Sequence, residues 1–207
     1  MTRRFFIERA LRQIYNGQPT DDSSVTIGLV NGWLPDAIGL AAKTNWKENI
    51  QIEGIGFVNN GFHTTFKGIG ITEDERFLYK FSLPEIPVGI GSSEGIAKVV
   101  FKDSGNNISY PSVMLSESQV SIQRSMRSVQ NKILCYQEGG ECFIITPIIM
   151  TDYTATVTMI SGGDSTNLDS TLNVPPDYFA VMVSYIQQQL LLEKKQIPDL
   201  QNDGRDN

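Results

Sequence analysis

The sequence predicts an α+β protein in which N- and C-terminal helices pack together and carry an antiparallel β-sandwich or small barrel. Apolar residues recur at helical spacing near both ends of the chain, and they alternate with polar residues in several short segments between. Turns rich in glycine and asparagine separate these segments, as is typical of sandwiches and barrels. We expect N-terminal helices in 1–48, the β domain in 49–172, a C-terminal helix in 173–195 and a flexible tail in 196–207.

Residues 2–15 predict the first helix, with Thr2 as its N-cap and a wide apolar stripe on one side. Its positive charge stands out in an acidic protein and comes from four arginines: Arg3, Arg4, Arg9 and Arg12. We expect these side chains on the surface, where they either keep the helix soluble or contact an acidic partner.

Residues 26–46 predict a second helical segment, in which Trp33 and Trp46 flank an apolar stripe. Proline lacks an amide donor and collides with the preceding turn, so we expect a break or kink between Gly32 and Pro35.

From Asn49 the spacing of apolar residues changes from helical to alternating. Residues 50–53 and 62–69 predict a hairpin that turns at 59–61, and residues 76–83 predict the clearest strand. The segment 83–91, with two prolines and two glycines, predicts extended chain without a full hydrogen-bond ladder.

Further strands are predicted by the same alternation and by the turn residues between them. The predicted elements are strands at 96–102 and 108–115, a short helix near 116–127 that opens with a Ser-x-x-Gln capping box, a hairpin over 132–146 that turns at 138–140, a strand at 153–160, and a helix over 176–194.

Composition excludes several classes of protein. The 207 residues carry 17 basic and 23 acidic side chains, and a net charge of −6 argues against a surface that wraps nucleic acid. No apolar run approaches the roughly 18–20 residues that span a bilayer, and the start lacks a signal-peptide core, so we expect neither an integral membrane protein nor a classically secreted one. Two cysteines and one histidine cannot build a four-ligand Cys/His zinc site.

The titratable candidates favour structural roles. His63 lies in a predicted strand without a serine or cysteine nucleophile motif, so a structural or surface histidine is favoured over a general base. Cys135 and Cys142 straddle the second hairpin turn. A cross-strand disulfide is geometrically possible if that turn is centred between Glu138 and Gly139, but two reduced, half-buried thiols are the favoured interpretation.

Glycine-rich and acidic segments give weak signals. Segment 89–95 starts as G-x-G, but no buried strand precedes it, which disfavours a nucleotide site. Segment 161–165 favours a turn over a calcium site. The acidic run 73–75 favours a solvated turn over a pair of glycosidase acids. Because no coherent nucleophile, base or metal set is present, we expect no enzyme and no cofactor.

Six blocks in a fixed order resemble a structural protein of crAss-like bacteriophages, which are short-tailed viruses. The blocks are FIERAL at 6–11, NIQIEGI at 49–55, HTTFKG at 63–68, YKFSLPEIP at 79–87, MISGGDST at 159–166 and NDGRDN at 202–207. The resemblance covers nearly the whole chain, and the layout of helices around a β domain also resembles head–tail adaptors of short-tailed phages.

The resemblance implies a ring or adaptor protein stacked beneath the portal. Such proteins form closed rings, usually twelvefold, around the DNA channel, and no catalytic residues are implied. We therefore expect contacts with further copies of the chain, the portal, and neighbouring ring or tail proteins. DNA is expected to pass without sequence-specific binding, no membrane is expected to be involved, and the protein is expected in the virion after assembly in the host cytoplasm.

The residues that we expect at subunit or partner interfaces are Arg4, Arg9, Arg12, Trp33, Trp46, Asp199, Asp203, Arg205 and Asp206. The acidic tail of one subunit is expected to meet the arginines of the next. The competing interpretation is a carbohydrate-binding β-sandwich of a phage tail or cell surface, which requires Tyr79, Phe81 and Tyr110 to be exposed on one sheet face.

Overall fold

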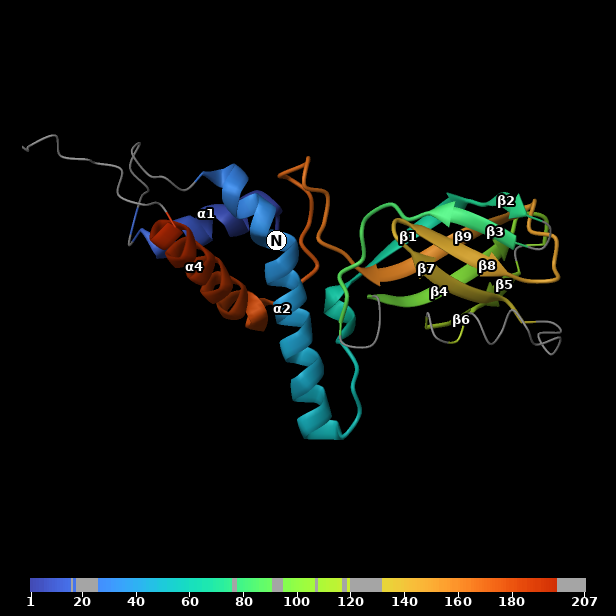
Figure 1. Cartoon of the computed structure of the whole chain (residues 1–207), viewed down its shortest axis with the longest axis horizontal. Helices are drawn as coiled ribbons and strands as arrows, with labels where there is room; N and C mark the ends of the chain where they lie inside the picture. Colours follow the sequence, from blue (N-terminus) through green and yellow to red (C-terminus); the bar gives the residue numbers. More distant parts are fainter. Residues whose placement is uncertain are drawn as a thin grey trace, which may run out of the picture.

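The computed structural model describes residues 1–15, 17, 26–75, 78–90, 95–106, 108–116, 119 and 132–196, with side chains described up to residue 193. Its helices are α1 (Arg3–Ile14), α2 (Ile27–Glu53) and α4 (Phe179–Gln196), with the 3-10 turns η1 (Asn60–Phe62) and η2 (Pro176–Tyr178). These helices gather at one end of the molecule and the strands at the other (Figure 1). The predicted α+β class is confirmed.

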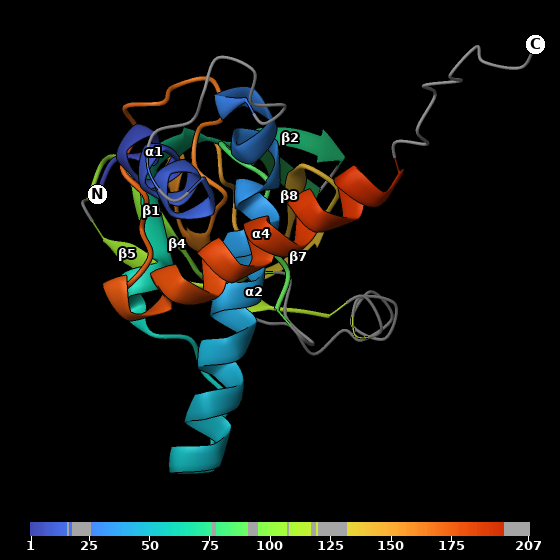
Figure 2. The same cartoon turned by 90° about the vertical axis from the view of Figure 1, so that its left-hand side faces the viewer.

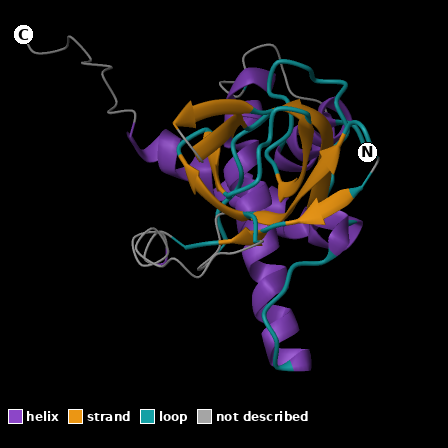
Figure 3. Cartoon of the chain, turned by 90° about the vertical axis from the view of Figure 1, so that its right-hand side faces the viewer, coloured by secondary structure: helices purple, strands orange, loops and turns teal. Residues whose placement is uncertain are grey.

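The strands form two sheets in an open sandwich. The first sheet has the order β1-β9-β4-β5 and the second has the order β2-β3-β8-β7-β6. The strands are β1 (His63–Gly70), β2 (Thr72–Glu75), β3 (Leu78–Ser82), β4 (Ile96–Asp103), β5 (Ser109–Pro111), β6 (Val113–Met114), β7 (Leu134–Glu138), β8 (Glu141–Ile145) and β9 (Tyr153–Ile160). Neighbours pair antiparallel, except that β6 pairs parallel with β7. Figure 3 looks onto this end, where the strands surround a common interior.

Two large hydrophobic cores and one small cluster, around Tyr136, are found among the described residues. The first lies among the helices, where Phe6 of α1 meets Phe179 of α4 edge-on at 5.8 Å between ring centroids. The second lies between the sheets, where Phe81 of β3 meets Phe101 of β4 at 6.4 Å. The predicted packing of N- and C-terminal helices is therefore confirmed, and the β domain is a sandwich whose core lies between its two sheets.

The predicted strand at 50–53 is wrong, because α2 continues to Glu53 and ends at Gly54, whose φ of 73° is the left-handed conformation that favours glycine. The predicted hairpin with 62–69 therefore does not form, and the helical segment extends beyond residue 48. The alternation of Ile50 and Ile52 does not reflect a buried sheet face, since both side chains are exposed.

Of the predicted break or kink near Pro35, the break does not form, because α2 is continuous through this residue. A proline at position 35 cannot donate to the carbonyl of Asn31, one turn earlier. Nη2 of Arg3 donates to that carbonyl instead, at 3.1 Å. The hydrogen bond that the helix loses at its proline is thus replaced by a side chain from α1.

Most other predicted elements are confirmed. Thr2 caps α1 and accepts a hydrogen bond from the amide of Phe5 at 3.3 Å. The acidic run 73–75 is not a turn but part of the exposed edge strand β2. Two predicted segments lie largely outside the described residues. Of the predicted short helix near 116–127, the structure describes residues 116 and 119, and of the predicted tail 196–207 it describes residue 196. At the first of these, the amide of Ser116 donates to Oε1 of Gln119 at 3.1 Å, as a capping box requires.

The second hairpin forms, but its register separates the two cysteines. Cys135 lies opposite Ile144, and Cys142 lies opposite Gln137, because the turn is centred between Gly139 and Gly140. The two thiols are therefore not cross-strand partners, and the structure contains no disulfide between them. Both are fully buried in the sandwich core rather than half-buried.

Candidate functional site

The C-terminal half of α2 and the loop after it project away from the rest of the molecule (Figures 1 and 2). We call residues 43–58 the α2 arm. Its tip carries large apolar side chains in water: Ile52 is 80% exposed and Ile55 is 67% exposed, and Ile50 and Phe57 are also exposed. Exposed apolar clusters on folded proteins mark contact sites. The arm tip is therefore the strongest candidate for an interaction surface.

A buried polar network fixes the direction of the arm. Asn45 is 1% exposed; its Nδ2 donates to Tyr178 Oη at 2.8 Å, and its Oδ1 accepts from the amide of Asn59 at 2.8 Å. Nδ2 of Asn49 donates to the carbonyl of Phe57 at 2.9 Å. These bonds tie the returning loop and η2 to the arm. Because buried polar groups are costly to leave unpaired, the arm is a rigid projection.

Both predicted interface tryptophans are half-buried and pack against the helical core of their own chain. Gly56 runs directly over Trp46, since a Cβ at position 56 would lie 2.5 Å from Cε2 of the indole. Trp46 is therefore already covered on one side by the loop of the arm. Both indoles therefore contribute to the fold of the protomer, and an interface role for Trp33 and Trp46 stays a prediction.

A groove of about 350 Å³ lies between α1 and the start of α4. Figure 2 shows these two helices side by side. The apolar part of its lining comes from Phe6, Phe179 and Val183, and the charged part comes from Arg9 and Asp177. We call this the α1–α4 groove. It combines an apolar floor with one exposed cation and one exposed anion.

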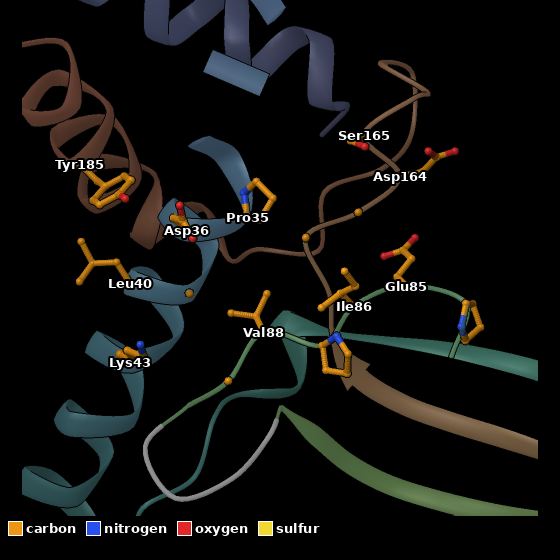
Figure 4. Close-up of a pocket in the computed structure, with 16 residues that line it drawn as sticks. Pro35, Asp36, Leu40, Lys43, Glu85, Ile86, Val88, Asp164, Ser165 and Tyr185 are labelled. Atoms are coloured by element: carbon orange, nitrogen blue, oxygen red, sulfur yellow. The ribbon is translucent and has the colours of Figure 1, made fainter. Parts of the chain in front are cut away.

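A larger pocket of about 790 Å³ separates the helical layer from the extended segment 84–89 and the loop 162–165 (Figure 4). Asp36 comes from α2, Glu85 from the extended segment and Asp164 from the loop, so carboxylates predominate over the single amine of Lys43. Asp164 accepts from the amide and hydroxyl of Thr166 at 2.9 and 2.6 Å. These bonds lower the pKa of Asp164 and identify its loop as the predicted turn.

Beside this pocket a buried arginine joins three segments. Arg3 is 0% exposed and donates through Nη1 to the carbonyl of Gly162 at 2.6 Å, through Nη2 to the carbonyl of Asn31, and through Nε to the side chain of Asn31. Burial lowers the pKa of Arg3, while the negative charges of Glu85 and Asp164 oppose that shift. The expectation that Arg3 lies on the surface is wrong, because its guanidinium is buried between Asn31 of α2 and Gly162 of the loop after β9.

The other three predicted arginines, Arg4, Arg9 and Arg12, are exposed as expected. Arg4 pairs with Asp169 at 3.1 Å, and Arg9 lines the α1–α4 groove. The predicted tail residues Asp199, Asp203, Arg205 and Asp206 lie outside the described residues, so their contact with the arginines of a neighbour stays a prediction.

The remaining candidates occupy structural positions. His63 begins β1, is half-buried, and has a pKa that burial lowers. Tyr79 and Phe81 are buried in the sandwich core, and the half-buried Tyr110 packs on Tyr153 at 5.8 Å. These aromatic residues do not form the exposed platform that carbohydrate binding requires. Among the residues the structure describes, no three His, Cys, Asp or Glu side chains gather closely enough to hold a metal ion.

Sequence reasoning missed the arm tip and the α1–α4 groove. The arm was missed because Ile50 and Ile52 alternate with polar residues, as in a strand. Gly54 is a typical helix C-cap residue, and it could have indicated that the second helix continues to residue 53. No local signal marks the groove, since α1 and the start of α4 lie at opposite ends of the sequence.

Comparison with known proteins adds no identification, since no family model and no curated protein matches this chain. Within the described part of the chain, none of the helices has the length and apolar character needed to cross a membrane.

Proposed function

We propose that the protein is a ring-forming head–tail connector or adaptor of a short-tailed bacteriophage. In this proposal its ring stacks below the portal, lines or supports the DNA conduit, and joins the capsid to the tail. The resemblance of six sequence blocks to a structural protein of crAss-like phages supports this assignment. The observation that carries it is the α2 arm, a rigid projection from a platform of terminal helices that ends in exposed isoleucines.

A projecting apolar tip favours assembly with other copies of the chain. A contact between two different patches repeats from subunit to subunit, and it makes a ring when the rotation closes. The arm supplies one patch, and the platform of α1, α2 and α4 offers surface for the other. We propose twelvefold closure because the ring proteins that the sequence resembles usually have it.

The charge of the protein suits a conduit for DNA. A net charge of −6 disfavours binding to the phosphate backbone, because tight binding would require an excess of lysine and arginine. A genome that passes through the ring would therefore slide without adhering to the wall. This property supports a passive conduit rather than a protein that holds DNA by its sequence.

Negative-stain electron microscopy of the purified chain tests the proposal. We expect closed rings with a central opening, and Ile52→Glu should reduce the fraction of protein in rings at least tenfold. Ile149→Glu is the matched control, because Ile149 is 69% exposed but follows β8 in the β domain. Single protomers in the wild type, or a stronger effect of Ile149→Glu than of Ile52→Glu, would contradict the proposal.

A further inference from the structure

We propose that the tip of the α2 arm of one protomer seats in the α1–α4 groove of a neighbouring copy. This inference rests on the proposed ring and names the two surfaces that form its seam. The base of the arm contacts η2 of its own chain through Asn45, but the tip projects away from the rest of that chain (Figures 1 and 2). A second copy of the chain is therefore the occupant.

The arm tip and the lining of the groove both contain apolar side chains. Ile52 and Ile55 are the most exposed of the large apolar side chains of the tip. Ile52 lies in the last turn of α2, and Ile55 follows the C-cap Gly54, beyond the hydrogen bonds of Asn45 that hold the arm. The groove is a hollow of about 350 Å³ whose apolar lining includes the half-buried Phe179, the exposed Ala180 and the buried Phe6. That volume is at the small end of binding pockets and suits one or two aliphatic side chains.

The charges beside the two surfaces are complementary. Glu53 is adjacent to Ile52 on the arm, and Lys47 lies further back toward the platform. Arg9 and Asp177 line the groove. None of these four exposed side chains takes part in an ion pair with another described residue. We assign Glu53 to Arg9, with Lys47 facing Asp177, because charge complementarity selects the register of an interface.

The larger pocket beside Arg3 is a poorer receptor for the arm. Three carboxylates line it, from Asp36, Glu85 and Asp164. Glu53 of an incoming arm would meet like charges there, and such contacts oppose binding. The α1–α4 groove instead offers Arg9, whose charge is opposite to that of Glu53. The charge of the arm therefore selects the groove.

Disulfide cross-linking tests the contact directly. Ile52→Cys places a thiol on the arm tip, and Ser184→Cys places one on an exposed position of the groove lining. The natural Cys135 and Cys142 are fully buried and do not compete. After mild oxidation the double variant should give a ladder of covalent multimers. Each single variant, and the pair Ile52→Cys with Ile149→Cys, should give no ladder.

Charge reversal tests the assigned pair without requiring a cross-link. Arg9→Glu and Glu53→Arg should each raise the dissociation constant between protomers about tenfold, and the double reversal should restore most of the loss. Arg12→Glu is the matched control, because Arg12 is exposed on the same helix but does not line the groove. Circular dichroism of each variant checks that it is folded.

The outcomes separate this inference from the proposed function. A ladder together with rescue by the double reversal supports both. Rings that persist in every folded variant, with neither ladder nor rescue, overturn the arm-in-groove contact and leave the ring intact. A wild-type chain that never assembles overturns the proposed function and the contact together.

Discussion

Arg3 shows how one side chain connects the helical layer to the end of the sandwich. Its guanidinium replaces the hydrogen bond that Pro35 removes from α2 and also reaches the carbonyl of Gly162, just after β9. Gly162 in turn packs on Pro35, because a Cβ at this glycine would lie 2.9 Å from Cβ of the proline. Pro35, Gly162 and Arg3 therefore depend on one another for their packing and hydrogen bonds.

Arg3→Met is expected to destabilise the protein by about 3 kcal/mol, because it leaves the buried carbonyls of Asn31 and Gly162 without their donor. Urea denaturation measures this loss. Arg4→Met is the matched control: its ion pair with Asp169 is exposed and should contribute less than about 1 kcal/mol. Equal losses in the two variants would contradict the role assigned to Arg3.

His63, the only histidine in the chain, gives the protein a defined pH dependence. Burial lowers its pKa below 6.5 in the folded state, so the unfolded chain takes up a proton first as the pH falls. The free energy of unfolding should therefore fall between about pH 7.5 and pH 5.5, where few carboxylates titrate.

Urea midpoints at these two pH values measure the effect. We expect a lower midpoint at the acidic pH in the wild type and a smaller decrease in His63→Gln. An equal decrease in both proteins would assign the pH dependence to groups other than His63.

At the residue scale, local rules predict local features. The cap at Thr2 followed from its hydroxyl and its place before an apolar stripe. The burial of Arg3 could not be predicted in this way, since arginine is almost never fully buried unless it is paired. Its acceptors belong to residues 31 and 162, which only the tertiary fold brings to it.

At the scale of elements, the sequence was informative where periodicity and turn chemistry agreed. The hairpin of β7 and β8 has both an alternating pattern and a Gly-Gly turn. At the end of α2 they disagreed: Ile50 and Ile52 alternate, but Gly54 gives the helix its end. The glycine proved the better guide, because residues 50–53 form the last turn of α2 and pair with no strand in the described part of the chain.

The Asn45 network makes α2 a rigid arm, and its removal is a test at this scale. Asn45→Ala should destabilise the protein by about 2 kcal/mol, because Tyr178 and the amide of Asn59 lose a buried partner. Amide hydrogen exchange should also become faster over residues 54–62. Gln51→Ala, an exposed change on the same arm, is the control.

Unchanged exchange in 54–62, together with a loss no larger than that of Gln51→Ala, would contradict the role of Asn45. A loss of stability with faster exchange confined to this loop would confirm that the network orients the arm rather than the whole platform.

At the scale of the molecule, terminal helices form a platform, a sandwich extends from one side, and an arm leaves the platform with apolar side chains at its tip. Sequence patterns predicted the platform and the sandwich, since each element carries its own apolar periodicity. They could not place the α1–α4 groove, because it exists only where α1 meets the start of α4.

The exposed arm tip favours an assembled protein over a solitary protomer. An exposed apolar tip costs free energy in a protein that works alone. In the proposed contact, a copy of the same chain covers the tip with a groove lined by apolar side chains and by Arg9 and Asp177. Two unlike patches on one protomer generate a contact that repeats from subunit to subunit. When the ring closes, every such patch is covered by a neighbour.

The mass of the intact protein in solution shows whether the chain assembles into a ring. Native mass spectrometry, with light scattering over a range of concentrations, should find one dominant assembly whose mass is a whole multiple of 23.0 kDa, with twelve copies as the expected number. A species of 23.0 kDa at every concentration would contradict the account, because the arm tip would then remain exposed without a partner.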